Sequence, residues 1–218
     1  MSDHSTESLI EALAADARPV TPLAPPLRRG LLTLAVLGLA GAALVAVGGD
    51  RDGLLARYSG RETLMMLEMA AMLLTALLAV LGAFALSVPG GRRGWMAAPL
   101  PAFAAWLSLS GIGCYQDVAR LGRAAWGWGH GANCLVFIIA AGLLVGAPLL
   151  WRLARARPVE PLPVALLGGL GAAALAALLL QFFHAAAVTV VDLAVHFAAV
   201  LLVVGLAALS RRRTLAPA

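Results

Sequence analysis

The stretch from Trp106 to Phe137, WLSLSGIGCYQDVARLGRAAWGWGHGANCLVF, determines how the whole chain is arranged. An apolar run ends at Cys114, a polar segment rich in tryptophan and glycine follows, and a second apolar run begins at Cys134. These are the only two cysteines, and three long apolar runs lie on each side of the segment between them. We therefore expect both thiols to lie at the same depth and on the same face of a membrane.

Six apolar runs account for most of the chain. Hydrophobic residues make up 61% of the 218 residues and charged residues only 12%, which is about half the charged fraction of globular proteins. About 20 apolar residues are enough for a helix to cross a bilayer. The sequence predicts an all-α polytopic membrane protein whose six transmembrane helices cover approximately 31–48, 63–88, 95–114, 134–151, 162–183 and 190–209.

The arginines indicate how these helices are oriented. Eleven lie in the N-terminal tail, the 92–93 and 152–157 turns and the 211–213 cluster, and five lie in the alternate loops. The arginine-rich side of a membrane protein is usually cytoplasmic, so we expect both termini inside the cell and both cysteines outside. The predicted organisation is a cytoplasmic tail (1–30), a transmembrane domain (31–210) and a cytoplasmic C-terminal tail (211–218).

The arginine-rich connections are short, which predicts that the helices they join are antiparallel neighbours. Small residues four positions apart allow such helices to approach closely. The pairs Gly142 with Gly146 and Gly168 with Ala172 have this spacing.

The N-terminal tail holds a candidate amphipathic helix. Ser5-Thr6-Glu7-Ser8 is typical of a helix start, and Arg18-Pro19 is expected to end the helix. Apolar residues recur between them at helical spacing, at Leu9, Ile10, Leu13 and Ala17. A helix this short is marginal alone in water, so the segment is either disordered or folded against a partner or the membrane. Residues 21–26, TPLAPP, form a stiff spacer before the first span.

Three ionisable residues lie within the apolar runs: Glu68, Asp192 and His196. Ionisable groups in a bilayer face the interior of a helix bundle, so they could form one cluster with Gln181 and His184. Such a cluster is either a switch that responds to protons or metal, or a hydrogen-bond network between helices. The network is favoured, because Asp192 and His196 are four residues apart on one helix face and can satisfy each other.

The two cysteines allow several interpretations. A disulfide would close a loop with 19 residues between the thiols and stabilise the fold by about 3 kcal/mol. It would be either a structural bridge or a redox-responsive pair, and two free thiols are the remaining possibility. A metal site made of Cys114, Cys134 and His130, with His184 or His196, is less well supported, because zinc sites usually contain a close-spaced ligand pair.

Enzymatic chemistry has no support in the sequence. There is no glycine-rich phosphate loop, nucleophile elbow or HExxH motif, and we expect no cofactor. The positive charge comes from arginines in the loops, in a chain without lysine. This usage is typical of a GC-rich genome, so we expect no direct binding of nucleic acid.

Several short motifs resemble the NrsF family. They are LIEALAADARPV at 9–20, PPLRR at 25–29, FALSVPG at 84–90, Gly113-Cys114, NCLVF at 133–137 and VHF at 195–197. Members of this family are six-span proteins of the bacterial inner membrane that act as anti-sigma factors for extracytoplasmic-function (ECF) sigma factors. Segment 183–187, FHAAA, departs from the family pattern.

The resemblance implies a mechanism. The cytoplasmic helix with Leu9, Ile10, Leu13 and Ala17 would hold an ECF sigma factor at the membrane. A periplasmic thiol, redox or metal signal at Cys114 and Cys134 would change the helix packing and release it. Two other classes stay open: a small ion- or proton-coupled transporter that uses Glu68, Asp192 and His196, and a quinone-linked thiol oxidoreductase.

Overall fold

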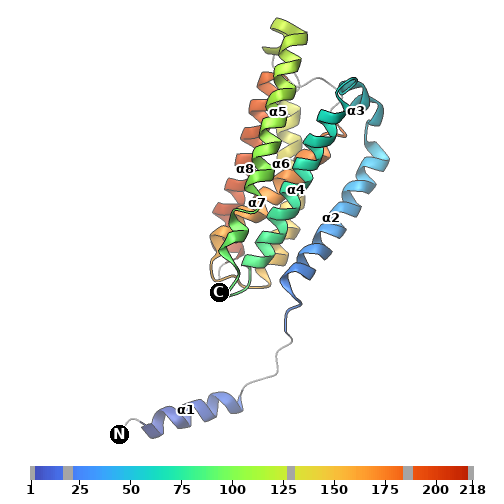
Figure 1. Ribbon diagram of the computed structural model, residues 1–218. Coiled ribbons are helices and arrows are strands. Elements are labelled where there is room, and N and C mark those ends of the chain that lie inside the picture. Colours follow the sequence, from blue (N-terminus) through green and yellow to red (C-terminus); the bar gives the residue numbers. More distant parts are fainter. Residues whose placement is uncertain (1–2, 17–21, 127–130, 184–188, 216–218) are drawn as a thin grey trace.

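The computed structural model describes residues 3–16, 22–126, 131–183 and 189–215, and all the regular structure in these ranges is helical. Six helices in them are long and apolar enough to cross a membrane, which confirms the predicted all-α, six-span architecture (Figure 1). They are α2 (Pro26–Gly48), α4 (Glu62–Leu86), α5 (Leu100–Leu121), α6 (Gly131–Ala154), α7 (Pro161–Leu180) and α8 (Val190–Thr214). The shorter elements are α1 (Asp3–Ala15), α3 (Arg51–Arg57), η1 (Arg93–Met96) and η2 (Gly122–Trp126).

Helix α7 lies at the centre of the bundle and packs against α4, α6 and α8. Its sequence, PLPVALLGGLGAAALAALLL, is apolar on every side, as expected of a helix that has no polar face to expose. Helix α2 lies at the edge and packs mainly against α4 (Figure 1). Most of its apolar residues are exposed, so its outer face is suited to contact lipid.

Small residues allow α6, α7 and α8 to approach one another closely: Gly168 contacts α6 as the sequence predicts, whereas Gly142 contacts α8 and not α7. A Cβ atom on Gly142 would lie 2.8 Å from Val203 on α8, and one on Gly168 would lie 3.2 Å from Leu153 on α6. Gly169 also lies against α8, where its Cβ would be only 2.9 Å from the backbone of Val204. Real Cβ atoms essentially never lie closer than 3.0 Å to such neighbours, so glycine is required at 142 and 169, where α6 and α7 meet α8.

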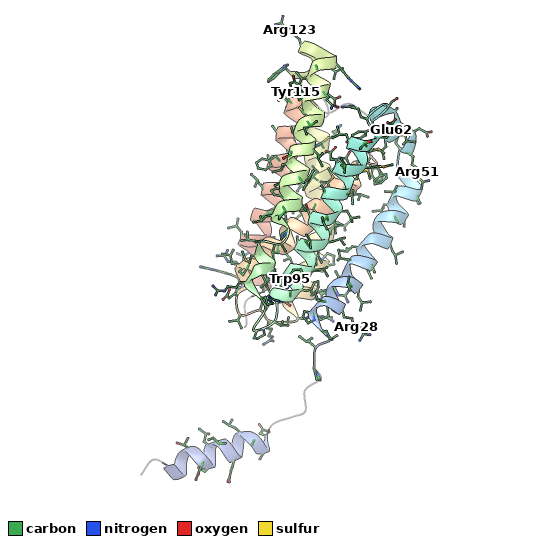
Figure 2. The ribbon with its side chains drawn as sticks, viewed as in Figure 1. Arg28, Arg51, Glu62, Trp95, Tyr115 and Arg123 are labelled. Carbon is green, nitrogen blue, oxygen red and sulfur yellow. The ribbon has the colours of Figure 1, made fainter. Side chains whose placement is uncertain are left out.

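The bundle has two distinct ends. The start of α2 and the end of α8 lie at one end, here called the terminal end, together with Arg28 and Trp95 (Figures 1 and 2). The opposite end, here called the distal end, holds Arg51, Glu62, Tyr115 and Arg123 (Figure 2). The chain therefore enters and leaves the described bundle on the same side, as an even number of spans requires.

One predicted helix is longer than its apolar run, and one helix is unpredicted, each for a physical reason. Helix α5 continues seven residues past Cys114 to Leu121, because Asp117 is neutralised by an arginine of another helix and remains inside the bundle. The unpredicted helix α3 begins after Asp50, whose side chain accepts a hydrogen bond from the Gly53 N–H at 2.8 Å and caps the helix.

Helix α1 begins at Asp3, two residues before the predicted start, and stands apart from the bundle (Figure 1). Its large apolar side chains are uncovered: Leu9 is 59% exposed, Ile10 60% and Leu13 65%. Ala17 and the predicted end at Arg18-Pro19 lie outside the described residues. The described part of the tail is therefore helical and presents an unpartnered apolar stripe, defined here as Leu9, Ile10 and Leu13.

Candidate functional site

A cavity of about 70 Å³ lies in the distal half of the bundle, between α4, α5, α7 and α8. This is enough space for several water molecules. Apolar and aromatic side chains, including Phe103, Trp106 and Phe197, form much of its wall. The side chains with polar groups or sulfur that line it are Tyr58, Arg61, Glu68, Met72, Ser110, Cys114, Asp117, Gln181 and His196.

Glu68 connects three elements at this cavity. It lies on α4 and is buried. The Tyr58 hydroxyl, just after α3, donates to Glu68 Oε2 at 2.8 Å. The Ser110 hydroxyl on α5 lies 2.6 Å from Glu68 Oε1. Because a buried carboxyl group is tolerated only when it is hydrogen-bonded, these contacts stabilise the packing of α3 and α5 against α4.

A buried ion pair lines the cavity. Arg61 Nη2, immediately before α4, lies 2.9 Å from Asp117 Oδ1 on α5, and each side chain is only 8% exposed. The guanidinium also lies 5.8 Å from the centre of the Tyr58 ring. The pair ties the start of α4 to the last turns of α5, and removing Arg61 would leave the buried Asp117 carboxylate without its guanidinium.

The two cysteines occupy different environments near this cavity. Cys114 is buried on α5 and lines the cavity. Cys134 is 2% exposed and packs in an apolar cluster with Ile138 and Leu180. Both of these residues also line the cavity, so the cluster around Cys134 adjoins it. No disulfide joins these two described thiols.

The sequence predicts that Asp192 and His196 satisfy each other, but the structure gives the two side chains different roles. Asp192 lies in the first turn of α8, where it forms a capping box with Thr189: the Thr189 N–H donates to Asp192 Oδ2 at 3.0 Å, and the Asp192 N–H donates to Thr189 Oγ1 at 3.1 Å. Asp192 Oδ1 accepts no hydrogen bond from any described residue. The free N–H groups of a helix start compete for a nearby carboxylate, so Asp192 caps its own helix. His196 instead lines the cavity.

Gln181 also reaches the cavity, where its amide lies 3.9 Å from Met72 Sδ. Among the described residues, no group of three His, Cys, Asp or Glu side chains is placed to hold a metal ion. His130 and His184, which belonged to the predicted metal set, lie outside those residues. The described site thus combines a hydrogen-bonded carboxyl group, an ion pair, an imidazole and a thiol around a small cavity whose wall is largely apolar.

Comparison with known proteins gives one informative match. A family model described as NrsF, negative regulator of sigma F, matches residues 13–216. The match begins at Leu13 on α1 and includes the whole described bundle with its cavity. Curated proteins and solved structures give no match.

Proposed function

The chain belongs to the NrsF family of negative regulators of sigma F, and on that premise we propose that it sequesters an ECF sigma factor at the bacterial inner membrane. Its partner is a sigma factor, and the regulator family suggests a non-enzyme. Residues 1–30 form the cytoplasmic part that binds the sigma factor, 31–210 form the transmembrane domain, and 211–218 form a second cytoplasmic tail. A periplasmic thiol, redox or metal signal releases the sigma factor.

The exposed apolar stripe of α1 is the observation that carries this proposal. Leu9, Ile10 and Leu13 lie on one side of the helix and are each more than half exposed, while Glu7 and Glu11 lie largely on the other side. An amphipathic helix of this kind binds by placing its apolar face in a groove of the partner. A membrane regulator also needs its binding surface outside the bilayer, where α1 stands clear of the bundle (Figure 1).

The distribution of arginine supports a cytoplasmic location for α1. The tail and the terminal end of the bundle carry Arg18, Arg28, Arg29, Arg92, Arg93, Arg152, Arg155, Arg157, Arg211, Arg212 and Arg213. The distal connections carry Arg51, Arg57, Arg61, Arg120 and Arg123. Since arginine-rich segments remain in the cytoplasm, the distal cavity faces the periplasm in this orientation.

The cavity is a suitable place to receive a signal. Its walls come from α4, α5, α7 and α8, so a change at Cys114 alters the packing of several helices at once. Cys134 lies in the adjoining cluster and would act on α6 and α7. A disulfide of this loop length stabilises the folded chain against the unfolded chain by about 3 kcal/mol, and it favours whichever helix packing brings the two thiols together.

The direct test is co-purification of the full chain, from membranes, with the ECF sigma factor encoded nearby. We expect the sigma factor to be retained with the membrane fraction, and a reporter fused at Met1 to be active in the cytoplasm. A sigma factor that stays soluble, or a reporter that proves to be periplasmic, would contradict the proposal.

Cys114→Ser and Cys134→Ser are each expected to alter induction of the sigma-dependent promoter, because either change removes one of the two thiols from the distal half. The measurement is a promoter reporter assayed with and without a thiol oxidant. Ser59→Cys, on an exposed distal turn, is the labelling control: a membrane-impermeant maleimide should modify it in spheroplasts much faster than the buried native thiols. Wild-type induction in both serine variants would reduce the pair to a structural role.

A small proton- or ion-coupled transporter is the second candidate, favoured by the presence of Glu68 and His196 in the same cavity. Ion flux in liposomes containing the purified chain, together with a tail that has no affinity for a sigma factor, would support it over the regulator.

A further inference from the structure

An open groove with a volume of about 620 Å³ lies at the terminal end of the bundle, between the α4–η1 turn and the α6–α7 connection. Its wall is largely apolar and includes Leu86, Val88, Met96, Val159, Leu162 and Leu166. Val159 is 76% exposed. Arg93 and Glu160 form an exposed ion pair at its edge, with 3.0 Å between Nη2 and Oε1. The groove thus has an apolar floor and a charged rim.

The tail that carries α1 is attached close to this groove. Arg29 Nη2, in the first turn of α2, donates to the Arg152 carbonyl at 3.0 Å. Arg152 lies near the end of α6, directly before the connection that contributes Val159 and Glu160 to the groove. The ten residues from Asp16 to Pro25 separate α1 from α2 and reach about 30 Å when extended. Because neighbouring helix axes are only about 8–10 Å apart, α1 can reach the groove.

Helix α1 as a whole and the terminal end of the bundle also carry opposite charges. Glu7 and Glu11 make α1 acidic, and Asp16 follows directly after it. The terminal end of the bundle is strongly basic, with Glu160 as the acidic residue among the arginines of the α4–α5 and α6–α7 connections and the end of α8. Opposite charges of this kind favour association and set the orientation of docking.

We propose that α1 alternates between the position seen in the structure, clear of the bundle, and one in which its apolar stripe is docked in this groove, so that the groove and the sigma factor compete for Leu9, Ile10 and Leu13. This inference rests on the proposed function, since it describes how the same helix is regulated. The affinity for the sigma factor is then reduced in proportion to the fraction of α1 that is undocked.

The competition also connects the cavity to the tail. Helix α4 carries Glu68 at the cavity and Leu86 at the groove. Helix α7 carries Leu180 at the cavity and Leu162 at the groove. A shift of α4 against α7 at the distal end therefore changes the shape of the groove, and with it the fraction of α1 available to the sigma factor.

A photo-cross-linking experiment tests the docking. A benzophenone maleimide is attached to the new cysteine of the Val159→Cys variant of the full chain in membrane vesicles. Cross-linking is carried out with and without purified sigma factor, and the products are identified by mass spectrometry. We expect a product with α1 of the same chain that falls at least about five-fold when the sigma factor is saturating. Leu55→Cys, on α3 at the distal end, is the matched control and should give no α1 product. Absence of the α1 product without sigma factor, or cross-links to a second copy or to the sigma factor, would overturn the proposal.

A binding measurement separates this inference from the proposed function. If α1 is docked nine-tenths of the time, Val159→Asp should tighten sigma-factor binding by about ten-fold, while Leu55→Asp should leave it unchanged. Unchanged affinity in Val159→Asp would overturn the competition but not sequestration. A chain that binds no sigma factor in any variant, yet still forms the α1 cross-link, would overturn the proposed function instead.

Discussion

Replacing Leu13 by aspartate is expected to release the sigma factor while the protein remains in the membrane. Leu13 lies on the apolar stripe of α1 and is 65% exposed, so its change disturbs no packing in the bundle. In the complex the same side chain is expected to be buried, and a charge there would be unpaired and desolvated. We expect a loss of about 2–4 kcal/mol of binding free energy, which corresponds to roughly 30- to 1,000-fold in affinity. Leu9→Asp should act in the same direction.

The measurement is the affinity of the full chain for the sigma factor in detergent, together with the activity of a sigma-dependent promoter in cells. Ser8→Asp is the matched control, because it adds the same charge to the opposite side of α1 and should change binding little. Equal protein levels in the membrane would show that the bundle is unaffected. Unchanged repression in both Leu9→Asp and Leu13→Asp would exclude the apolar stripe as the binding element.

The sequence predicts the six spans well because the information is local. A run of about 20 apolar residues forms a helix in a bilayer regardless of its neighbours, so the positions of α2, α4, α6, α7 and α8 follow from composition along the chain. The helix ends are less predictable. Helix α5 extends past its apolar run because a tertiary contact neutralises Asp117, and no local pattern contains that information.

The polar contacts around the cavity depend on the fold and not on local sequence. Glu68 and Ser110 are 42 residues apart and meet only when α4 packs on α5. Arg61, which counts as a loop charge in the sequence, becomes part of a buried ion pair for the same reason. Asp192 is different, since the spacing Thr189-x-x-Asp192 at the start of an apolar run is close to a capping-box pattern. That pattern predicts that Asp192 caps the helix, whereas its spacing of four residues from His196 predicts a side-chain pair, and the two predictions compete.

Replacing Asp117 by alanine should destabilise the bundle more than any exposed polar change. It leaves the Arg61 guanidinium, with its side chain 8% exposed, without its carboxylate partner. Breaking a buried ion pair in this way costs about 3–5 kcal/mol. In a chain of this size that corresponds to a fall of roughly 10 °C in the unfolding midpoint. The measurement is thermal unfolding of the purified protein in detergent, together with the level of folded protein in the membrane.

Two comparisons decide whether the burial of this pair causes the effect. Arg93→Ala breaks the ion pair between Arg93 and Glu160, in which the two side chains are 86% and 61% exposed. Exposed ion pairs contribute at most about 1 kcal/mol to stability, so this change should lower the unfolding midpoint little. The double replacement of Arg61 by methionine and Asp117 by leucine removes both charges together, and such apolar substitutions restore stability when the cost comes from an uncompensated charge. We therefore expect the double variant to be more stable than Asp117→Ala. If all three variants unfold at the wild-type temperature, the pair does not hold α4 to α5. In that case the distal end opens to water more freely than the 8% exposure of Arg61 and Asp117 implies.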